Sequence, residues 1–253
     1  MYRLSVSLDS PAKNLALDEA LLDWAEMQPG GVELVRLWEP DVPFVVVGRS
    51  SRLEQEVDLA ACQQQGVSVF RRSSGGAAIA TGPGCLMYAV ILSYHQRPEL
   101  RPIDQAHSAV LDRMLKAVRP LVPNVACAGT SDLILQTSPT GQTSPTCKNR
   151  GWKFSGNSMR AKRNHFLYHG TLLCNFDLSL ITTCLRTPPR QPEYREQRSH
   201  DQFVVNLSVP IETLREAIFK SWEAHDFLTD WPREQTFKLA TTRYLQESWT
   251  HLL

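Results

Sequence analysis

The segment from Phe70 to Val90, FRRSSGGAAIATGPGCLMYAV, places fixed positive charge beside backbone that glycine leaves accessible. Arg71 and Arg72 carry planar guanidinium groups that stay charged and match the oxygens of a phosphate or carboxylate. Gly75 and Gly76 allow a ligand to approach the main chain closely. Together these residues predict a turn that binds an anion through backbone amides and a guanidinium. A tight hairpin carrying two surface arginines is the alternative interpretation.

The common nucleotide-binding motifs are missing from this segment. It contains no G-x-x-x-x-G-K-[ST], and its glycine run, GGAAIATGPG, does not fit G-x-G-x-x-G. The turn therefore belongs to neither a P-loop nor a dinucleotide-binding fold.

The composition is that of a globular chain. Of its 253 residues, 42% are apolar and 21% are charged, which is enough apolar material for a substantial core. The formal net charge of +1 argues against a dedicated nucleic-acid binder, which carries a strong basic excess. No apolar run approaches the ~18–20 residues of a membrane span, and the first residues lack the layout of a signal peptide. We therefore expect a cytoplasmic protein with neither nucleic acid nor a membrane as partner.

Hydrophobic periodicity predicts interleaved helices and strands. Helices are expected from Ser10, Asp104 and Ile211, with short ones at 57–66 and 239–249. Strands are expected at 32–38, 44–48, 67–71, 86–93, 131–136, 152–156 and 165–176, the last interrupted at Gly170. Because several strands are joined by short turns, the pattern indicates one α+β domain over 1–253, with a mixed or antiparallel sheet flanked by helices. The polar repeat QTSPTGQTSPT predicts a disordered hairpin tip at about 136–148.

The cysteines form no C-x-x-C pair and have no histidines at zinc-site spacing. In a reducing compartment they are expected as free thiols that fill the core. They are Cys62, Cys85, Cys127, Cys147, Cys174 and Cys184.

Several segments resemble, in the same order, the lipoate–protein ligase and octanoyltransferase family, whose superfamily includes the biotin–protein ligases. These segments are NLALDEALL (14–22), LVRLWEPDVPFVVVGRSSRLEQEVDLAACQQQGVSVFRRSSGGAAI (34–79), GTSDLIL (129–135) and KFSGNSMRAKRNHFLYHGTLL (153–173). The resemblance covers about residues 14–180. It implies a catalytic domain of the biotin/lipoate-ligase type, in which an acyl chain lies in a tunnel beside a mixed sheet.

The resemblance also implies a reaction. A ligase of this family activates lipoate or octanoate with ATP to an acyl-adenylate, and a carrier lysine then attacks the activated carbonyl. ATP and Mg²⁺ are the implied cofactors. The implied partners are lipoyl domains of 2-oxo-acid dehydrogenases or the glycine-cleavage H protein.

Lys153 matches the lysine of the family motif, which makes it the expected catalytic residue. Its ammonium would contact the acyl carbonyl and a phosphate oxygen and would stabilise the oxyanion during attack. A solvated surface lysine is the alternative.

Further residues are expected to bind substrate or nucleotide by the same match. Asp132 is also the expected Mg²⁺ contact, because a hard cation prefers carboxylate oxygen, and His169 is expected to position groups and not to act as a base. Ala77 stands where ligases usually have a third glycine. The full set is Arg72, Ser74, Gly75, Gly76, Ala77, Ala78, Thr81, Gly82, Asp132, Ser155, Gly156, Asn157, His169, Gly170 and Thr171.

Two alternatives stay open. Full-length ligases carry a C-terminal accessory domain for which this chain leaves no room, so a separate accessory subunit is one expectation. The other is an octanoyltransferase, which forms a cysteine thioester and needs no ATP; its candidate nucleophiles are Cys127 and Cys184. A non-catalytic binder of lipoyl groups or adenylate is the weakest interpretation, because the lysine and the glycine turn occur together.

Overall fold

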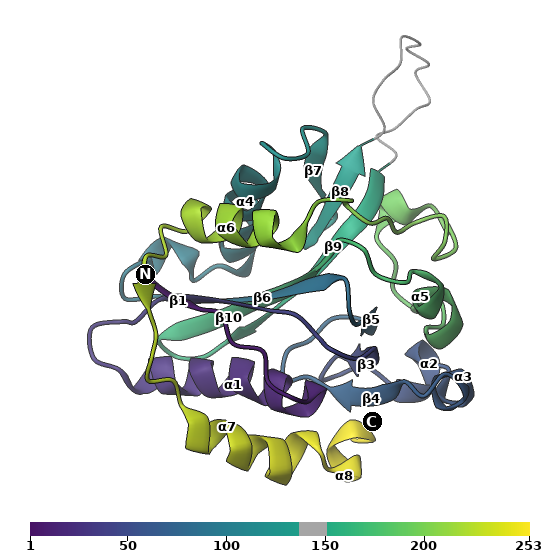
Figure 1. The fold of residues 1–253 in the computed structure, drawn as a ribbon, viewed down its shortest axis with the longest axis horizontal. Helices are drawn as coiled ribbons and strands as arrows, with labels where there is room; N and C mark the ends of the chain where they lie inside the picture. Colours follow the sequence, from purple (N-terminus) through teal and green to yellow (C-terminus); the bar gives the residue numbers. More distant parts are fainter. Residues whose placement is uncertain (137–150) are drawn as a thin grey trace.

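The computed structural model describes residues 1–136 and 151–253 (Figure 1). The strands are β1 (Tyr2–Leu4), β2 (Leu34–Trp38), β3 (Phe44–Val47), β4 (Ser68–Arg71), β5 (Ile79–Thr81), β6 (Cys85–Ser93), β7 (Val125–Ala128), β8 (Asp132–Gln136), β9 (Gly151–Ala161), β10 (His165–Leu173) and β11 (Asp226–Phe227). The helices are α1 (Pro11–Met27), α2 (Leu53–Glu56), α3 (Leu59–Gln64), α4 (Ile103–Val118), α5 (Ser179–Cys184), α6 (Ile211–Ser221), α7 (Arg233–Leu239) and α8 (Glu247–Thr250). Short 3₁₀ turns cover Pro98–Leu100 and Glu193–Arg195, and a π-helical turn, Ala240–Tyr244, joins α7 to the segment before α8.

The described strands form two sheets. The larger has the order β11-β1-β2-β6-β10-β9-β8-β7, and the smaller has the order β4-β3-β5. The larger sheet is mixed. Its strand β1 runs parallel to β2 and β11, whereas each neighbouring pair in the remaining order β2-β6-β10-β9-β8-β7 is antiparallel. This confirms the expected α+β class with a mixed sheet.

Helices cover both faces of the larger sheet (Figure 1). Along β2, Val35 and Leu37 enter the core beneath α4 and α6, whereas Leu34 enters the core beneath α1. The alternation follows from the two-residue period of a strand. On α1, Leu17 and Leu21 are fully buried against the sheet, and burial of each leucine contributes about 1.5–3 kcal/mol.

The first helix begins where the sequence indicates. Ser10 caps it by accepting a hydrogen bond from the Lys13 amide at 3.3 Å, and Pro11 occupies its first turn. Its buried side chains include the polar Asn14, Asp18 and Glu19. Buried polar groups need partners. Asn14 and Asp18 both contact Arg36, and Asp18 also contacts His169 in the candidate site described below.

Most expected elements are confirmed, and the differences arise from short or bent pieces. The strand expected at 165–176 ends at Leu173 and runs unbroken through Gly170, which pairs with Tyr88 and Asn157. The helix expected at 57–66 is α3, preceded by the separate α2. The strands β1, β5, β7 and β11 and the helix α5 had no clear signal, since few residues form each of them and their partners are distant in sequence.

The hairpin tip expected at about 136–148 lies outside the described residues, except Gln136, which ends β8. None of the helices in residues 1–136 and 151–253 combines the length and the apolar character that a bilayer crossing requires.

Candidate functional site

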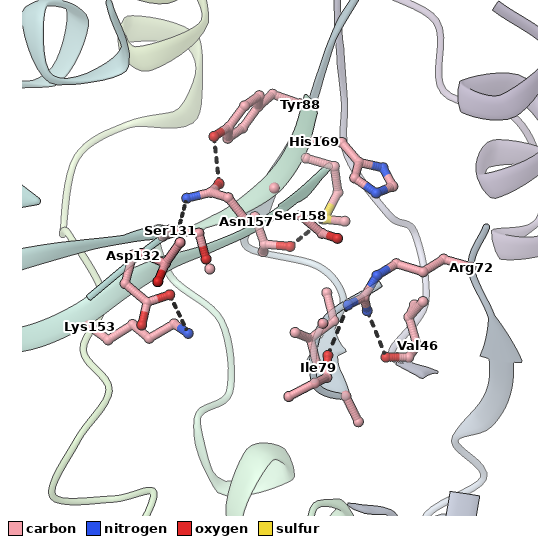
Figure 2. Close-up of a pocket in the computed structure, with 18 of the residues that line it drawn as sticks. Val46, Arg72, Ile79, Tyr88, Ser131, Asp132, Lys153, Asn157, Ser158 and His169 are labelled. Carbon is pink, nitrogen blue, oxygen red and sulfur yellow. Dashed lines mark hydrogen bonds and ion pairs between the residues drawn. The ribbon is translucent and has the colours of Figure 1, made fainter. Parts of the chain in front are cut away.

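A cavity of about 360 Å³ lies where the end of β4 meets β8, β9 and β10 (Figure 2). Its size is typical of small-ligand sites. Apolar side chains line one part, and polar groups line the rest. The lining residues include Leu15, Asp18, Val46, Arg72, Gly76, Ala77, Ala78, Ile79, Met87, Tyr88, Ser131, Asp132, Lys153, Gly156, Asn157, Ser158, His169, Gly170, Thr171 and Arg190.

A second cavity, of about 140 Å³, adjoins the first. Both are lined by Lys153, Gly156, Ala77 and Ala78, so the lysine lies where the two meet. The remaining wall of the second cavity is largely apolar and includes Phe154, Leu173, Ile181, Leu185, Phe203 and Val204. The lysine therefore lies between a cavity of mixed lining and a largely apolar one, whose wall also includes Glu56, Arg186, Arg195 and His200.

Lys153 forms an ion pair with Asp132 inside the larger cavity, with Nζ 2.8 Å from Oδ1. An irregularity between β8 and β9 shifts the register, so that Lys153 pairs with Ile134. Residues opposite each other share a face, as do residues two apart in a strand, so the shift places the lysine on the face of Asp132. Gly156 leaves the space, because a Cβ there would lie 2.9 Å from Nζ.

Arg72 shapes the glycine turn from inside. Its buried guanidinium donates to the carbonyls of Gly75, Ala77 and Val46 and to the Ser74 hydroxyl. Burial lowers the pKa of Arg72 to about 10. Because these N–H groups already donate to acceptors within the protein, the Arg72 side chain mainly stabilises the conformation of the turn at the cavity.

Arg71 is a buried structural residue, which corrects the interpretation of two surface arginines. Its guanidinium, fully buried, donates to the carbonyls of Gly48, Ser51 and Thr250 at 2.7 to 3.0 Å. The indole of Trp249 donates in return to the Arg71 carbonyl at 2.8 Å. Arg71 therefore joins the start of the turn to the helix α8.

The turn itself places backbone at the cavity. Gly76 has a φ of +87°, a conformation that suits glycine, and a Cβ there would lie 2.9 Å from the Arg72 guanidinium. The next residue, Ala77, has no such φ, so the alanine is accommodated without strain. The Ala78 amide donates to Glu56 Oε2 at 2.5 Å, which removes that amide from anion binding.

Asn157 and Ser158 connect β9 to the rest of the site. Asn157 accepts from the Tyr88 hydroxyl at 2.5 Å and donates to the Ser131 carbonyl at 2.6 Å. Ser158 donates to the Gly75 carbonyl at 2.7 Å. These contacts fix the turn and the segment before β8 against the same strand.

His169 contacts both the glycine turn and α1. Its Nε2 is 2.6 Å from the Ser74 hydroxyl, and its Nδ1 is 3.3 Å from Asp18 Oδ2. Asp18 in turn accepts from the buried Arg36 at 2.5 Å. Lys153 and Asp132 lie on one side of the cavity, and Arg72 and His169 lie on the other (Figure 2).

Not every expected residue reaches a cavity. Thr81 is buried and donates to the Met87 sulfur at 3.2 Å, and Gly82 packs against Pro43, so neither lines a cavity. Ser155 lines the smaller cavity but not the larger one. Ser74 and Gly75 line neither cavity and act through His169 and the Arg72 guanidinium.

Neither candidate nucleophile lines a cavity in the described structure. Cys184 is fully buried in α5, where its carbonyl accepts from the Cys62 thiol at 3.9 Å. Cys127 is exposed on β7. Burial raises the pKa of both Cys127 and Cys184 thiols, whereas a nucleophilic cysteine needs a lowered one. The described cysteines carry no disulfide, as expected.

Sequence reasoning missed several residues that complete the site. Tyr194, from the proline-rich segment after α5, donates to Asp132 Oδ2 at 2.6 Å. Asp18, Tyr88, Ser158 and Glu56 also reach the site or its turn. Asn14 and Asp18, four residues apart, lie among the buried residues of α1. Polar residues rarely occupy the apolar face of a helix, so this spacing was the signal in the sequence that pointed to Asp18.

Comparison with known proteins identifies the family of the chain. Residues 10–223 match the family model described as the lipoyl protein ligase A/B catalytic domain. The chain therefore belongs to the lipoate–protein ligase and octanoyltransferase family, as its motifs suggest.

Two relatives illustrate the range of the family. The octanoyltransferase LipM of Geobacillus kaustophilus is 26% identical over 265 residues, which cover 94% of this chain and 93% of that protein. A putative lipoate-protein ligase A of Aeropyrum pernix is 30% identical over 173 residues, which cover 68% of this chain and 57% of that protein. The relatives thus include both types of enzyme.

Solved structures share the fold. A bi-partite lipoate protein ligase of Thermoplasma acidophilum, whose structure was described with its E2 lipoyl domain, superposes with a TM-score of 0.79 at 22% identity, covering 100% of this chain and 98% of that chain. A lipoate-protein ligase A bound with ATP gives 0.78 at 20% identity, with both chains fully covered.

Proposed function

We propose that this enzyme is an ATP-dependent lipoate–protein ligase that joins lipoate or octanoate to a lysine of a lipoyl carrier domain. The observation that carries the proposal is the Lys153 ammonium, which lies in one cavity with the glycine turn and at its junction with a second, apolar cavity. No cysteine of residues 1–136 and 151–253 lines either cavity, which favours activation by ATP over a thioester.

Activation brings the carboxylate of the acid against the α-phosphate of ATP, so two anions must approach each other. Lys153 supplies a compact cation between the two reacting groups, and the backbone of Gly76 supplies a close approach. The apolar side chains of Leu15, Val46 and Met87 suit the acyl chain. The second cavity, which adjoins the lysine, suits the nucleotide base.

Asp132 is the carboxylate that would bind Mg²⁺. The described residues hold no cluster of three or more metal-ligating side chains, and Mg²⁺ commonly binds one or two carboxylates together with substrate phosphates. Asp132 would serve as one such carboxylate for a Mg²⁺ ion that enters with ATP, and the ion would neutralise phosphate charge. Asp132 would exchange its contacts with Lys153 and Tyr194 for the ion.

The partner we propose is a lipoyl domain, as in the structure described for the Thermoplasma acidophilum ligase. The basic side chains near the end of β9 are a poor docking surface. Arg160 pairs with Glu19 and Lys162 pairs with Asp23, both at 2.5 Å. Arg190, exposed at the edge of both cavities, is a better candidate for contact with an acidic carrier.

Incubation of the protein with ATP, Mg²⁺, lipoate and a lipoyl domain tests the proposal. Lipoylated carrier and pyrophosphate in equal amounts are the expected products. Product that forms only from octanoyl-acyl carrier protein, without ATP, would overturn the ligase assignment.

The similarity to LipM over nearly the whole chain favours octanoyl transfer as the second candidate function. Cys127, which is exposed on β7, would be the nucleophile. In that case Cys127→Ser abolishes transfer from octanoyl-acyl carrier protein. Cys184→Ser serves as the buried comparison.

A further inference from the structure

A buried series of polar contacts reaches the cavity from α1. Arg36, with no exposed surface, donates to Asp18 Oδ1 at 2.5 Å and to the Asn14 carbonyl at 2.9 Å. The other carboxylate oxygen of Asp18 faces His169 Nδ1 at 3.3 Å. The acidic group is therefore held in one orientation between a fixed cation and the ring.

These contacts define the tautomer of His169. A carboxylate only accepts, so Nδ1 carries the hydrogen and donates to Asp18. In the neutral ring Nε2 is then an acceptor, and the Ser74 hydroxyl donates to it at 2.6 Å. The Ser74 oxygen accepts in turn from Arg72 Nε at 3.1 Å. His169 lines the larger cavity on the side opposite Lys153 (Figure 2), and its accepting nitrogen faces the Ser74 hydroxyl.

We propose that His169, oriented by Asp18, is the base that accepts the proton from the carrier lysine during acyl transfer. The proposal rests on the proposed function. The lysine amine, as neutral NH₂, attacks the carbonyl carbon, and a C–N bond forms while the bond from that carbon to the phosphate oxygen of AMP breaks. AMP leaves with the electron pair, and one N–H proton passes to Nε2, directly or through the Ser74 hydroxyl.

The neighbouring groups are poorly suited to this step. His169 faces Asp18 from α1, Ser74 from the turn, and Ser158 from β9, its register partner. Lys153 is paired with one oxygen of the Asp132 carboxylate, and the Tyr194 hydroxyl donates to the other.

The second imidazole among the described cavity residues is turned away from this role. His200 lines the smaller cavity, where its Nε2 is 3.3 Å from the Arg186 carbonyl and its Nδ1 faces Arg195 at 3.4 Å. Nε2 therefore donates, and the acceptor nitrogen faces a guanidinium. The accepting nitrogen of His169, a residue that lines the larger cavity, faces the Ser74 hydroxyl instead.

The test compares two nucleophiles on the same activated acyl group. Hydroxylamine is a weakly basic amine whose attack needs no enzymatic base, whereas the carrier lysine needs one. In His169→Gln, transfer to a lipoyl domain should fall by about 100-fold, a much larger loss than that of ATP- and lipoate-dependent hydroxamate formation. Added imidazole should restore part of the transfer in His169→Ala.

Asp18→Asn keeps an oxygen for Arg36 but offers Nδ1 an amide that favours the other tautomer. It should lose much more of the transfer to the lysine than of hydroxamate formation. His107→Gln, a change of the same type at a histidine that contacts Tyr168 outside both cavities, should leave both rates unchanged.

Equal losses with lysine and hydroxylamine in His169→Gln would overturn the inference, because they would show a residue that shapes the site for activation. This outcome differs from failure of the proposed function, in which the unaltered enzyme itself makes no hydroxamate from ATP and lipoate.

Discussion

The ammonium of Lys153 lies 2.8 Å from the carboxylate of Asp132 because the strand that carries the lysine is irregular. In a regular antiparallel pair the lysine would face the opposite side of the sheet. The shifted register brings it onto the face of Asp132, and Gly156 leaves space for it. The irregularity therefore aims the expected catalytic residue into the cavity.

Replacement of Lys153 by alanine should reduce carrier lipoylation by about 100- to 1000-fold, the typical effect of removing a group that stabilises an oxyanion. Lys153→Arg should also be defective, because the planar guanidinium is a poor substitute for a compact ammonium between two oxygens. Initial rates of carrier lipoylation measure both.

The chain offers a matched control for this prediction. Lys162 pairs with Asp23 at 2.5 Å and is about as exposed as Lys153, 28% against 27%, but it lines neither cavity. Lys162→Ala should therefore retain activity. If the two alanine variants behaved alike, the role given to Lys153 would be lost.

Asp132→Asn should raise the Mg²⁺ concentration needed for half-maximal activity, because a neutral amide is a weaker ligand than a carboxylate. A titration of Mg²⁺ at saturating ATP measures this shift. Asp23→Asn tests the same chemical change in the control pair and should leave the titration unaltered. An unchanged Mg²⁺ requirement in Asp132→Asn would remove Asp132 as a metal ligand.

Arg71→Met should destabilise the protein by about 3 kcal/mol or more, since it leaves several buried carbonyls without donors. The carbonyls of Gly48, Ser51 and Thr250 are among those affected. Urea unfolding monitored by tryptophan fluorescence measures the change. Arg163→Met, at an exposed position, should shift the free energy of unfolding by no more than about 0.5 kcal/mol; a similar loss in both variants would contradict the role of Arg71.

Glu19 should make stability depend on pH in the acid range. Burial alone raises the pKa of Glu19, but the guanidinium of Arg160, the Tyr244 hydroxyl and Arg243 outweigh it and hold the pKa below its ordinary 4.5. The stabilisation is therefore present above pH 4.5 and is lost as the pH falls through the lowered pKa.

Glu19→Gln tests this dependence. The variant should be less stable at neutral pH, and the difference from the unaltered protein should shrink below pH 4.5. Thermal unfolding measured across the acid range gives both curves. If the stability of the variant and that of the unaltered protein differed by the same amount at every pH, the charge of Glu19 would contribute nothing to the pH dependence of stability.

The family motifs predicted many of the residues that line the larger cavity, because these motifs are read along continuous stretches of chain. The glycine turn, Lys153, Asp132 and Asn157 all occur in such stretches, and each lines the cavity or, like Gly75, braces it. The period of apolar residues likewise predicted the main helices and strands. These features depend on residue type and local spacing, which the sequence contains directly.

The tertiary structure decided which polar groups engage one another. Arg71, Thr81 and Gly82 occur in the predicted motif, yet the fold uses the first to hold α8 and buries the other two away from both cavities. Asp18 reaches His169 across 151 positions of chain. A side chain's partners depend on strand register and helix packing, which arise only when distant segments fold together, so residue type alone left these roles undetermined.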